Sequence, residues 1–366
     1  MPTKLLPLQP DIEHLRRQAT ELLKGHAAGE LDACQRIREF HPRFAGLADA
    51  AIRAGAFTAT DAELSIAHEY GFASWAGLEA HVASGDSSNL RRPHHERIED
   101  PDFRHAVDLI DHGDVDGLRG HLRSHPDLVR QRVTFEGGNY FRQPTLLEFV
   151  AENPVRHDTL PPNIVDVART ILESGGRDDR SSLESTLMLV SSGRVPRERG
   201  VQVPLIDLLC DHGADPNAAM PAAVGHGEWE AVDALIRRGG AVDLAVAAAT
   251  GRVDAARRAL GATDAALRHR ALAWAAQYGH VDIVRMLVDA GEDPNRYNPE
   301  GAHSHSTPMH QAALAGHAGV VRLLVERGAR RDIRDILFHG TPLEWAEHGG
   351  RSEIASYLSN LPAASS

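Results

Sequence analysis

One stretch, residues 307–332, contains a complete helix–turn–helix unit and sets what the rest of the chain must supply. Thr307 is suited to an N-cap, because its hydroxyl accepts from a backbone N–H of the first turn, and Pro308 follows where no N–H is needed. Gly316 is placed to end this helix, and a second apolar face follows before Gly328. Two helices this short cannot bury both apolar faces alone, so the unit needs neighbours of the same kind.

The sequence contains several such neighbouring units. Residues 279–295 read GHVDIVRMLVDAGEDPN, and the same pattern returns at equal length from Gly316 and from Gly227. Thr341 opens a T-P-L motif that repeats the T-P-M helix start at Thr307. This tandem pattern resembles the ankyrin-repeat family, whose period is about 33 residues with a T-P-L-H-type signature. The resemblance covers roughly residues 103–360. It implies an all-α fold with short hairpin loops, an ankyrin-repeat α-solenoid of stacked helix pairs.

Composition and periodicity also predict the division into domains. Residues 1–83 predict a small N-terminal helical unit, and within it 67–82 resembles a segment at the front of bacterial ankyrin-repeat proteins. The polar segment 84–101 is expected to be a linker, with His94 and His95 solvated. The array is expected over 102–361, with a degenerate capping repeat near 103–129, insertion-bearing repeats over 140–217, compressed repeats over 218–262 and regular repeats over 263–360.

The bulk chemistry limits the classes of partner. A formal net charge of −12 argues against nucleic acid and acidic membranes, which need a basic face. Cys34 and Cys210 are too few for a disulfide framework. Neither a signal peptide nor an apolar run of membrane-spanning length is present, so we expect a cytoplasmic protein without a membrane segment.

By the resemblance, one position of each first helix lies on the concave side of the array. Together with the helix ends and one hairpin, this surface supplies the candidate partner-binding residues Phe149, Trp274, Gln277, Tyr278, Tyr297, His303, His305, Gln311, Leu314, Trp345 and His348. Exposed tryptophan and tyrosine are frequent binding anchors. The alternative is that Trp274 and Trp345 pack sideways between repeats. His303 and His305 alternate as metal ligands would, but no carboxylate or cysteine stands at ligand spacing, so neither a metal site nor a cofactor is expected.

Two functions follow as competing hypotheses. The leading one is a protein-interaction scaffold that uses the concave aromatic face and the hairpin tips, with a dimer through the N-terminal unit as an additional hypothesis. The alternative is a small-molecule-binding protein or enzyme with its site near the insertion at 152–163. No phosphate loop, nucleophile elbow or H-E-x-x-H motif favours an enzyme. The scattered groups that this alternative would use are Glu148, His157, Asp158, Tyr278 and His348.

Overall fold

The structure, a computed structural model, describes residues 4–85, 88–137 and 140–361. These residues are helical or irregular and contain no β-strand, which confirms the all-α prediction. They fall into two compact units. Residues 25–55 group with the chain from 241 onward, here the C-terminal unit, and residues 4–24 group with 56–240, here the central unit. This grouping differs from the predicted boundary at residue 83.

The helices before the array begin with the 17-residue α1 and continue with shorter elements. They are α1 (Ile12–Ala28), α2 (Leu31–Phe40), η1 (Pro42–Phe44), α3 (Asp49–Ala54), α4 (Ala59–Glu69), α5 (Trp75–Ser84), η2 (Asn89–Arg91) and η3 (His94–Arg97). Helix α4 begins after Thr58, whose side chain forms a reciprocal capping box with Asp61. The box fixes the start of the helix because it satisfies backbone donors of the first turn from both sides.

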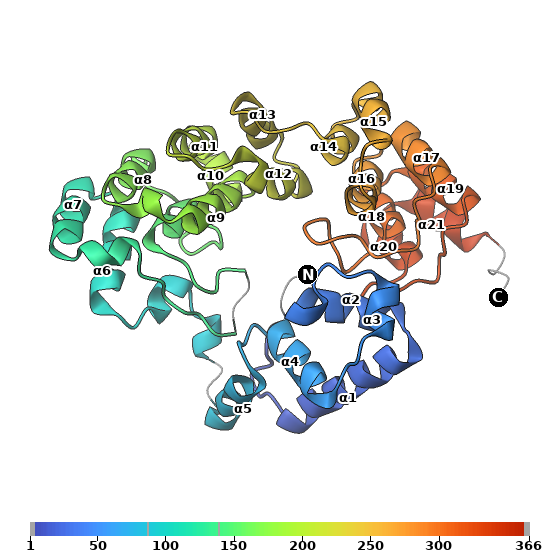
Figure 1. Cartoon of the computed structure of the whole chain (residues 1–366), viewed down its shortest axis with the longest axis horizontal. Coiled ribbons are helices and arrows are strands. Elements are labelled where there is room, and N and C mark those ends of the chain that lie inside the picture. The colour runs from blue at the N-terminus through green and yellow to red at the C-terminus, as the bar shows by residue number, and fades with distance from the viewer. Residues whose placement is uncertain (1–3, 86–87, 138–139, 362–366) are drawn as a thin grey trace. The chain divides into compact units, whose positions relative to one another are not determined.

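The central unit continues as a two-layer stack of helix pairs (Figure 1). Its elements are α6 (Pro101–His112), α7 (Val115–Ser124), η4 (Pro126–Val129), η5 (Leu146–Ala151), α8 (Ile164–Glu173), η6 (Gly176–Asp178), α9 (Arg180–Ser191), α10 (Arg194–Glu198), α11 (Gln202–Asp211), α12 (Pro216–Gly225) and α13 (Trp229–Arg237). One layer runs α6, η5, α9, α12, and the other runs α7, α8, α11, α13, each element contacting the next. Each pair thus covers the apolar face of its neighbour.

The C-terminal unit repeats this arrangement (Figure 1). Its elements are α14 (Leu244–Ala249), α15 (Val253–Leu260), α16 (Ala265–Gln277), α17 (Val281–Asp289), α18 (Pro308–Ala315), α19 (Ala318–Glu326), α20 (Pro342–His348) and α21 (Ser352–Ser359). The first helices α14, α16, α18 and α20 form one layer, and α15, α17, α19 and α21 form the other. We call the two layers the inner and outer layers in both units.

The helix ends predicted for the stretch 307–332 are present in the structure. Thr307 caps α18 in a box whose other member is His310, and Pro308 occupies the first turn. Gly316 ends α18 in the left-handed conformation with φ +95°, which a residue with a Cβ atom rarely adopts. Equivalent boxes join Thr145 to Glu148 and Thr341 to Glu344.

The segment between α5 and α6 packs instead of being solvated. The His94 ring lies edge-on to Phe135 and Phe141, with ring centroids 4.8 and 5.3 Å away. Ile98 is fully buried, and burial lowers the pKa of His94 to about 4. Because the segment is polar on average, its composition did not indicate that His94 and Ile98 make apolar contacts. Among the described residues, no helix combines the length and hydropathy needed to cross a bilayer.

Candidate functional site

A cavity of about 470 Å³ opens in the C-terminal unit beside the inner layer. It is lined by Leu314 from α18, by Glu344, Trp345 and His348 from α20, and by the loop residues Phe338, His339 and Gly340. Phe338 is 74% exposed, an unusual state for a phenylalanine, while Trp345 is buried with an edge against the cavity. The cavity therefore offers an apolar wall with an aromatic ring at its rim.

Asp335 holds the loop in this shape. Its buried carboxylate accepts hydrogen bonds from the backbone N–H groups of Leu337, Phe338 and Gly340 at 3.0, 2.7 and 2.8 Å. It also accepts from the indole Nε1 of Trp345 at 2.9 Å, so one carboxylate ties the loop to α20. Burial by itself raises the pKa of Asp335, but these donated hydrogen bonds outweigh it and the pKa lies below its ordinary value. Phe338 is thereby presented by a rigid loop.

This carboxylate predicts a pH-dependent contribution to stability. Because the pKa of Asp335 is lower in the folded protein, its contribution is complete above the unfolded pKa of about 4 and is lost as the pH falls through the folded value. We expect Asp335→Asn to lower the free energy of unfolding at pH 7 by about 2–3 kcal/mol. The difference from wild type should shrink toward pH 3 in urea titrations. Asp254→Asn, a change at an exposed carboxylate in the same unit, is the control, and an undiminished difference at pH 3 would contradict this role for Asp335.

Two histidine rings pack against the indole of Trp345. The His310 ring lies edge-on to the indole with centroids 5.2 Å apart, and the His305 ring lies 5.8 Å away. His310 Nδ1 is 2.8 Å from Thr307 Oγ1, and its Nε2 is 3.1 Å from the Gly340 carbonyl oxygen. Burial lowers the pKa of both histidines to about 4, so at neutral pH they are uncharged packing groups. His310 therefore links the start of α18 to the loop that carries Phe338.

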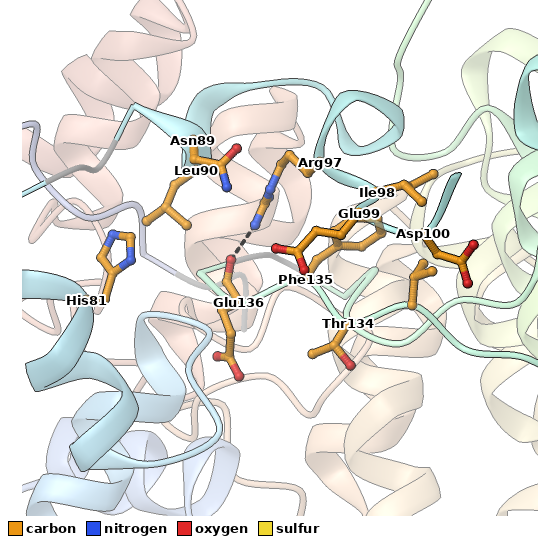
Figure 2. A pocket seen from close by; sticks show the side chains of 11 residues that line it. His81, Asn89, Leu90, Arg97, Ile98, Glu99, Asp100, Thr134, Phe135 and Glu136 are labelled. Carbon is orange, nitrogen blue, oxygen red and sulfur yellow. Dashed lines mark hydrogen bonds between the residues drawn. The ribbon is translucent and has the colours of Figure 1, made fainter. Parts of the chain in front are cut away.

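The central unit contains a second cavity of similar volume, about 470 Å³ (Figure 2). Figure 2 shows Arg97 reaching across it to the Glu136 carbonyl oxygen, to which Nη2 donates at 2.6 Å. The guanidinium also lies 5.3 Å from the Phe135 ring centroid, and its burial lowers the pKa of Arg97. The Asp100 carboxylate at the edge is engaged by Gln131 and by two backbone N–H groups of α6. Arg97 Nη2 and the Asp100 carboxylate already bond to the protein itself, so this cavity is the weaker candidate.

Comparison with known proteins agrees with this architecture. A family profile described as ankyrin repeats (3 copies) matches residues 187–298, and one described as ankyrin repeats (many copies) matches 272–325. The chain is also similar to cyclin-dependent kinase 4 inhibitor B of Bos taurus, with 33% identity over 124 residues, which make up 33% of this chain and 92% of that protein. The chain belongs to the ankyrin-repeat family. Ankyrin repeats generally mediate protein–protein interaction, so protein binding is the class of function that this membership supports.

The ankyrin array places the predicted partner-binding residues in three states of exposure. Phe149, Trp274, Gln311, Trp345 and His305 are buried, Gln277, Tyr278, Tyr297 and Leu314 are half-buried, and His303 and His348 are exposed. Phe149 belongs to the central unit and the others to the C-terminal unit. Trp274 is only 1% exposed, so it packs between repeats, the alternative that the sequence left open. The cause is the inner layer, where α16 contacts α14 on one side and α18 on the other.

The groups proposed for a scattered active site are engaged elsewhere. Glu148 lies in its capping box, where it accepts from the Thr145 N–H at 2.6 Å, and burial raises its pKa. His157 Nε2 is 3.0 Å from Asp111, and Asp158 pairs with Arg194. Tyr278 and His348 belong to the other unit. None of these contacts supports the small-molecule or enzyme alternative.

The insertion at 152–163 instead folds around an internal ion pair. Arg156 donates to both carboxylate oxygens of Asp111 at 2.8 and 2.7 Å, and its Nη2 lies 3.1 Å from Glu152. Glu152 accepts in turn from the N–H groups of Arg156 and Asp158 at 2.7 and 3.0 Å. The insertion is therefore fixed to α6 through Asp111. Arg156, Asp111 and Glu152 thus bond to groups of the protein rather than lining a pocket.

Two residues that shape the C-terminal cavity, Phe338 and Asp335, were not among the candidates predicted from sequence. Phe338 lies in a loop of mixed charge, and no helical or strand-like period marks it. The charges of this loop, Asp335 among them, suit protein recognition as well as solubility, so the sequence does not single out Asp335. The signal that could have drawn attention to the loop is the run Ile336, Leu337, Phe338 between polar neighbours, because three consecutive apolar residues in a surface finger are uncommon.

Proposed function

We propose that this ankyrin-repeat protein acts as an interaction scaffold and binds its protein partner at the cavity between α18, α20 and the loop 335–340. Phe338 is the anchor of this surface. The supporting observation is that an aromatic ring stands 74% exposed beside a cavity walled by Leu314 and Trp345. Aromatic side chains near the centre of an interface supply large contact area at small entropy cost.

The groups around this cavity define the chemistry of the partner. A volume of about 470 Å³ accommodates one or two bulky side chains. Glu344 and His348 are exposed at its edge, and Arg334 lies 3.4 Å from the Glu344 carboxylate. An apolar side chain flanked by hydrogen-bond donors would fill the cavity and engage the polar rim, the arrangement that stable interfaces share.

The neighbouring hairpin extends the proposed surface. The Tyr297 hydroxyl donates to the Arg334 carbonyl oxygen at 2.7 Å, and the His305 ring lies 6.1 Å from that of Phe338. His303, exposed at the tip, lies 6.1 Å from His305 by ring centroids. Hairpin residues of the predicted partner-binding set are thus tied to the loop that carries the anchor, which supports a surface formed by both fingers.

The relative from Bos taurus supports the class of partner. By its name, that protein inhibits a cyclin-dependent kinase, an action exerted on another protein. The similarity covers a third of this chain, so we propose for this chain only that its partner is a protein. The domain boundaries, the dimer through residues 1–83, the cytoplasmic location and the bacterial type stay predictions.

Removal of the anchor tests the proposal. We expect Phe338→Ser to reduce the capture of partner proteins by the immobilised full chain by about tenfold or more, because an interface anchor is lost. The measurement is quantitative mass spectrometry of proteins captured from a lysate of the source organism. Trp229→Ser removes an exposed aromatic ring from α13 in the central unit and is the matched control. Equal capture by the Phe338→Ser variant and wild type would refute the site.

A further inference from the structure

Three side chains with metal-binding atoms meet at the first helix pair of the array. Asp102 is the second residue of α6, His121 lies in the last turn of α7, and His125 directly follows α7. His121 and His125 are four residues apart around the end of α7, and their ring centroids lie 4.6 Å from each other. Packing of α6 against α7 brings Asp102 beside them. One ligand atom from each residue lies within 4.8 Å of the others.

The distances are close to those that zinc requires. Tetrahedral Zn²⁺ with bonds of about 2.0–2.1 Å separates its ligand atoms by roughly 3.3 Å. His125 Nε2 and Asp102 Oδ2 are already 3.6 Å apart. His121 Nε2 lies 2.9 Å from the backbone carbonyl oxygen of Asp102, and the His121 ring centroid lies 4.6 Å from that of His125. All three residues thus offer a ligand atom within 4.8 Å of the other two.

The orientation of His125 favours a cation at this place. Its Nδ1 lies 3.3 Å from the His121 carbonyl oxygen and is positioned to donate to it. In the tautomer that makes this donation, Nε2 carries the lone pair and faces the Asp102 carboxylate 3.6 Å away, the arrangement that a metal ion between the two groups requires. A backbone carbonyl that fixes the second nitrogen of a histidine is the usual support of a metal ligand.

The composition and exposure of the site identify the class of metal. Two imidazoles with one carboxylate suit Zn²⁺ and similar first-row divalent ions, whereas Mg²⁺ and Ca²⁺ prefer oxygen ligands alone. Asp102 and His125 are about half exposed, so an ion can enter and a water molecule can take the fourth position. The exposed ring of His105 lies 4.8 Å from that of His121 and adds a third imidazole to the surroundings.

We propose that Asp102, His121 and His125 form a zinc site that fastens the start of α6 to the end of α7. The first pair of a solenoid has a neighbour on one side only, so a cross-link there stabilises the end of the array. Binding to the folded chain raises its stability in proportion to the logarithm of free zinc concentration over the dissociation constant. No metal site was predicted from sequence, because His303 and His305 alternate but have no carboxylate or cysteine at ligand spacing. Asp102 and His121 are distant in sequence and meet only through helix packing.

Zinc titration of the full chain tests the proposal. After removal of metal with a chelator, Zn²⁺ affinity is measured by competition with a chromophoric chelator, and thermal unfolding is followed with and without Zn²⁺. We expect His125→Ala and Asp102→Asn to weaken zinc binding by at least about tenfold and to abolish the zinc-dependent rise in unfolding temperature. Co²⁺ should give the visible absorption of a four-coordinate site in wild type and not in these variants.

Other histidines require a matched control, because the chain contains 22 of them. His112→Ala removes an exposed histidine from the end of α6 that is not in the cluster, and it should leave zinc affinity unchanged. The three substituted side chains are at the surface, so circular dichroism should match wild type in every variant. Equal zinc affinity in wild type and His125→Ala, or an equal loss in His112→Ala, would overturn the proposal.

Discussion

Trp274→Ala is expected to lower the free energy of unfolding by about 3–5 kcal/mol, because truncating a fully buried tryptophan leaves a cavity in the core. The indole is 1% exposed in α16, which packs between α14 and α18. The guanidinium of Arg270 lies 5.9 Å from the ring centroid and would lose this contact as well. Urea titration followed by far-ultraviolet circular dichroism measures the effect.

A second tryptophan supplies the control for this prediction. Trp229 is 41% exposed on α13, so Trp229→Ala creates no closed cavity and should cost about 1 kcal/mol or less. Equal losses in the two variants would show that burial is not the source of the effect. The comparison also separates stability from binding. Reduced partner capture by Trp274→Ala would reflect damage to the array, whereas the same result for Phe338→Ser would report on the surface.

Arg156→Met should also destabilise the protein strongly, by about 3–5 kcal/mol, because it leaves a buried carboxylate without its counter-ion. The side chains of Arg156 and Glu152 are each only 1% exposed. Arg156 further bonds to Asp111 and to the Phe149 carbonyl oxygen, and its guanidinium lies 5.0 Å from the Phe149 ring. Methionine retains much of the apolar stem of arginine, so the loss in the free energy of unfolding reports mainly on the removed charge.

A double variant separates charge from packing in this network. Glu152→Gln removes the negative charge but keeps an oxygen that can accept the N–H groups of the insertion. Arg156→Met with Glu152→Gln should therefore be more stable than the sum of the two single losses predicts. Additive losses would contradict the ion-pair explanation. Arg194→Met removes the exposed partner of Asp158 in the same region and is expected to have little effect.

The fold was predictable because its signals are local. A capping box joins residues three positions apart, so a helix start can be predicted from a single turn of sequence. Thr307 with His310 and Thr341 with Glu344 are two such boxes. Glycines in phase mark the turns, and apolar spacing marks the outer helices. The packed segment around His94 is an exception of the opposite kind. It depends on Phe135 and Phe141, which lie far along the chain, so no local pattern predicts its packing.

The candidate site was predictable only in part. Leu314, Trp345 and His348 belong to the expected surface, and the structure places all three around one cavity. Trp274 holds the equivalent position two repeats earlier, in α16, and is 1% exposed, against 9% for Trp345. The difference arises because α16 has an inner helix on each side, while α20 is the last inner helix and leaves an edge of Trp345 against the cavity.

The sequence by itself determined a repeating pair of helices, their capped starts and membership in a stack, because these follow from hydrophobic period and from bonds within one turn. Tertiary structure alone decided which aromatic rings are buried and which charged groups meet. Phe338 stands exposed because Asp335 bonds to its backbone and to Trp345. Asp102 reaches His121 and His125 because two helices pack side by side. Burial and proximity depend on neighbours supplied by other repeats, and a one-dimensional pattern does not contain their positions.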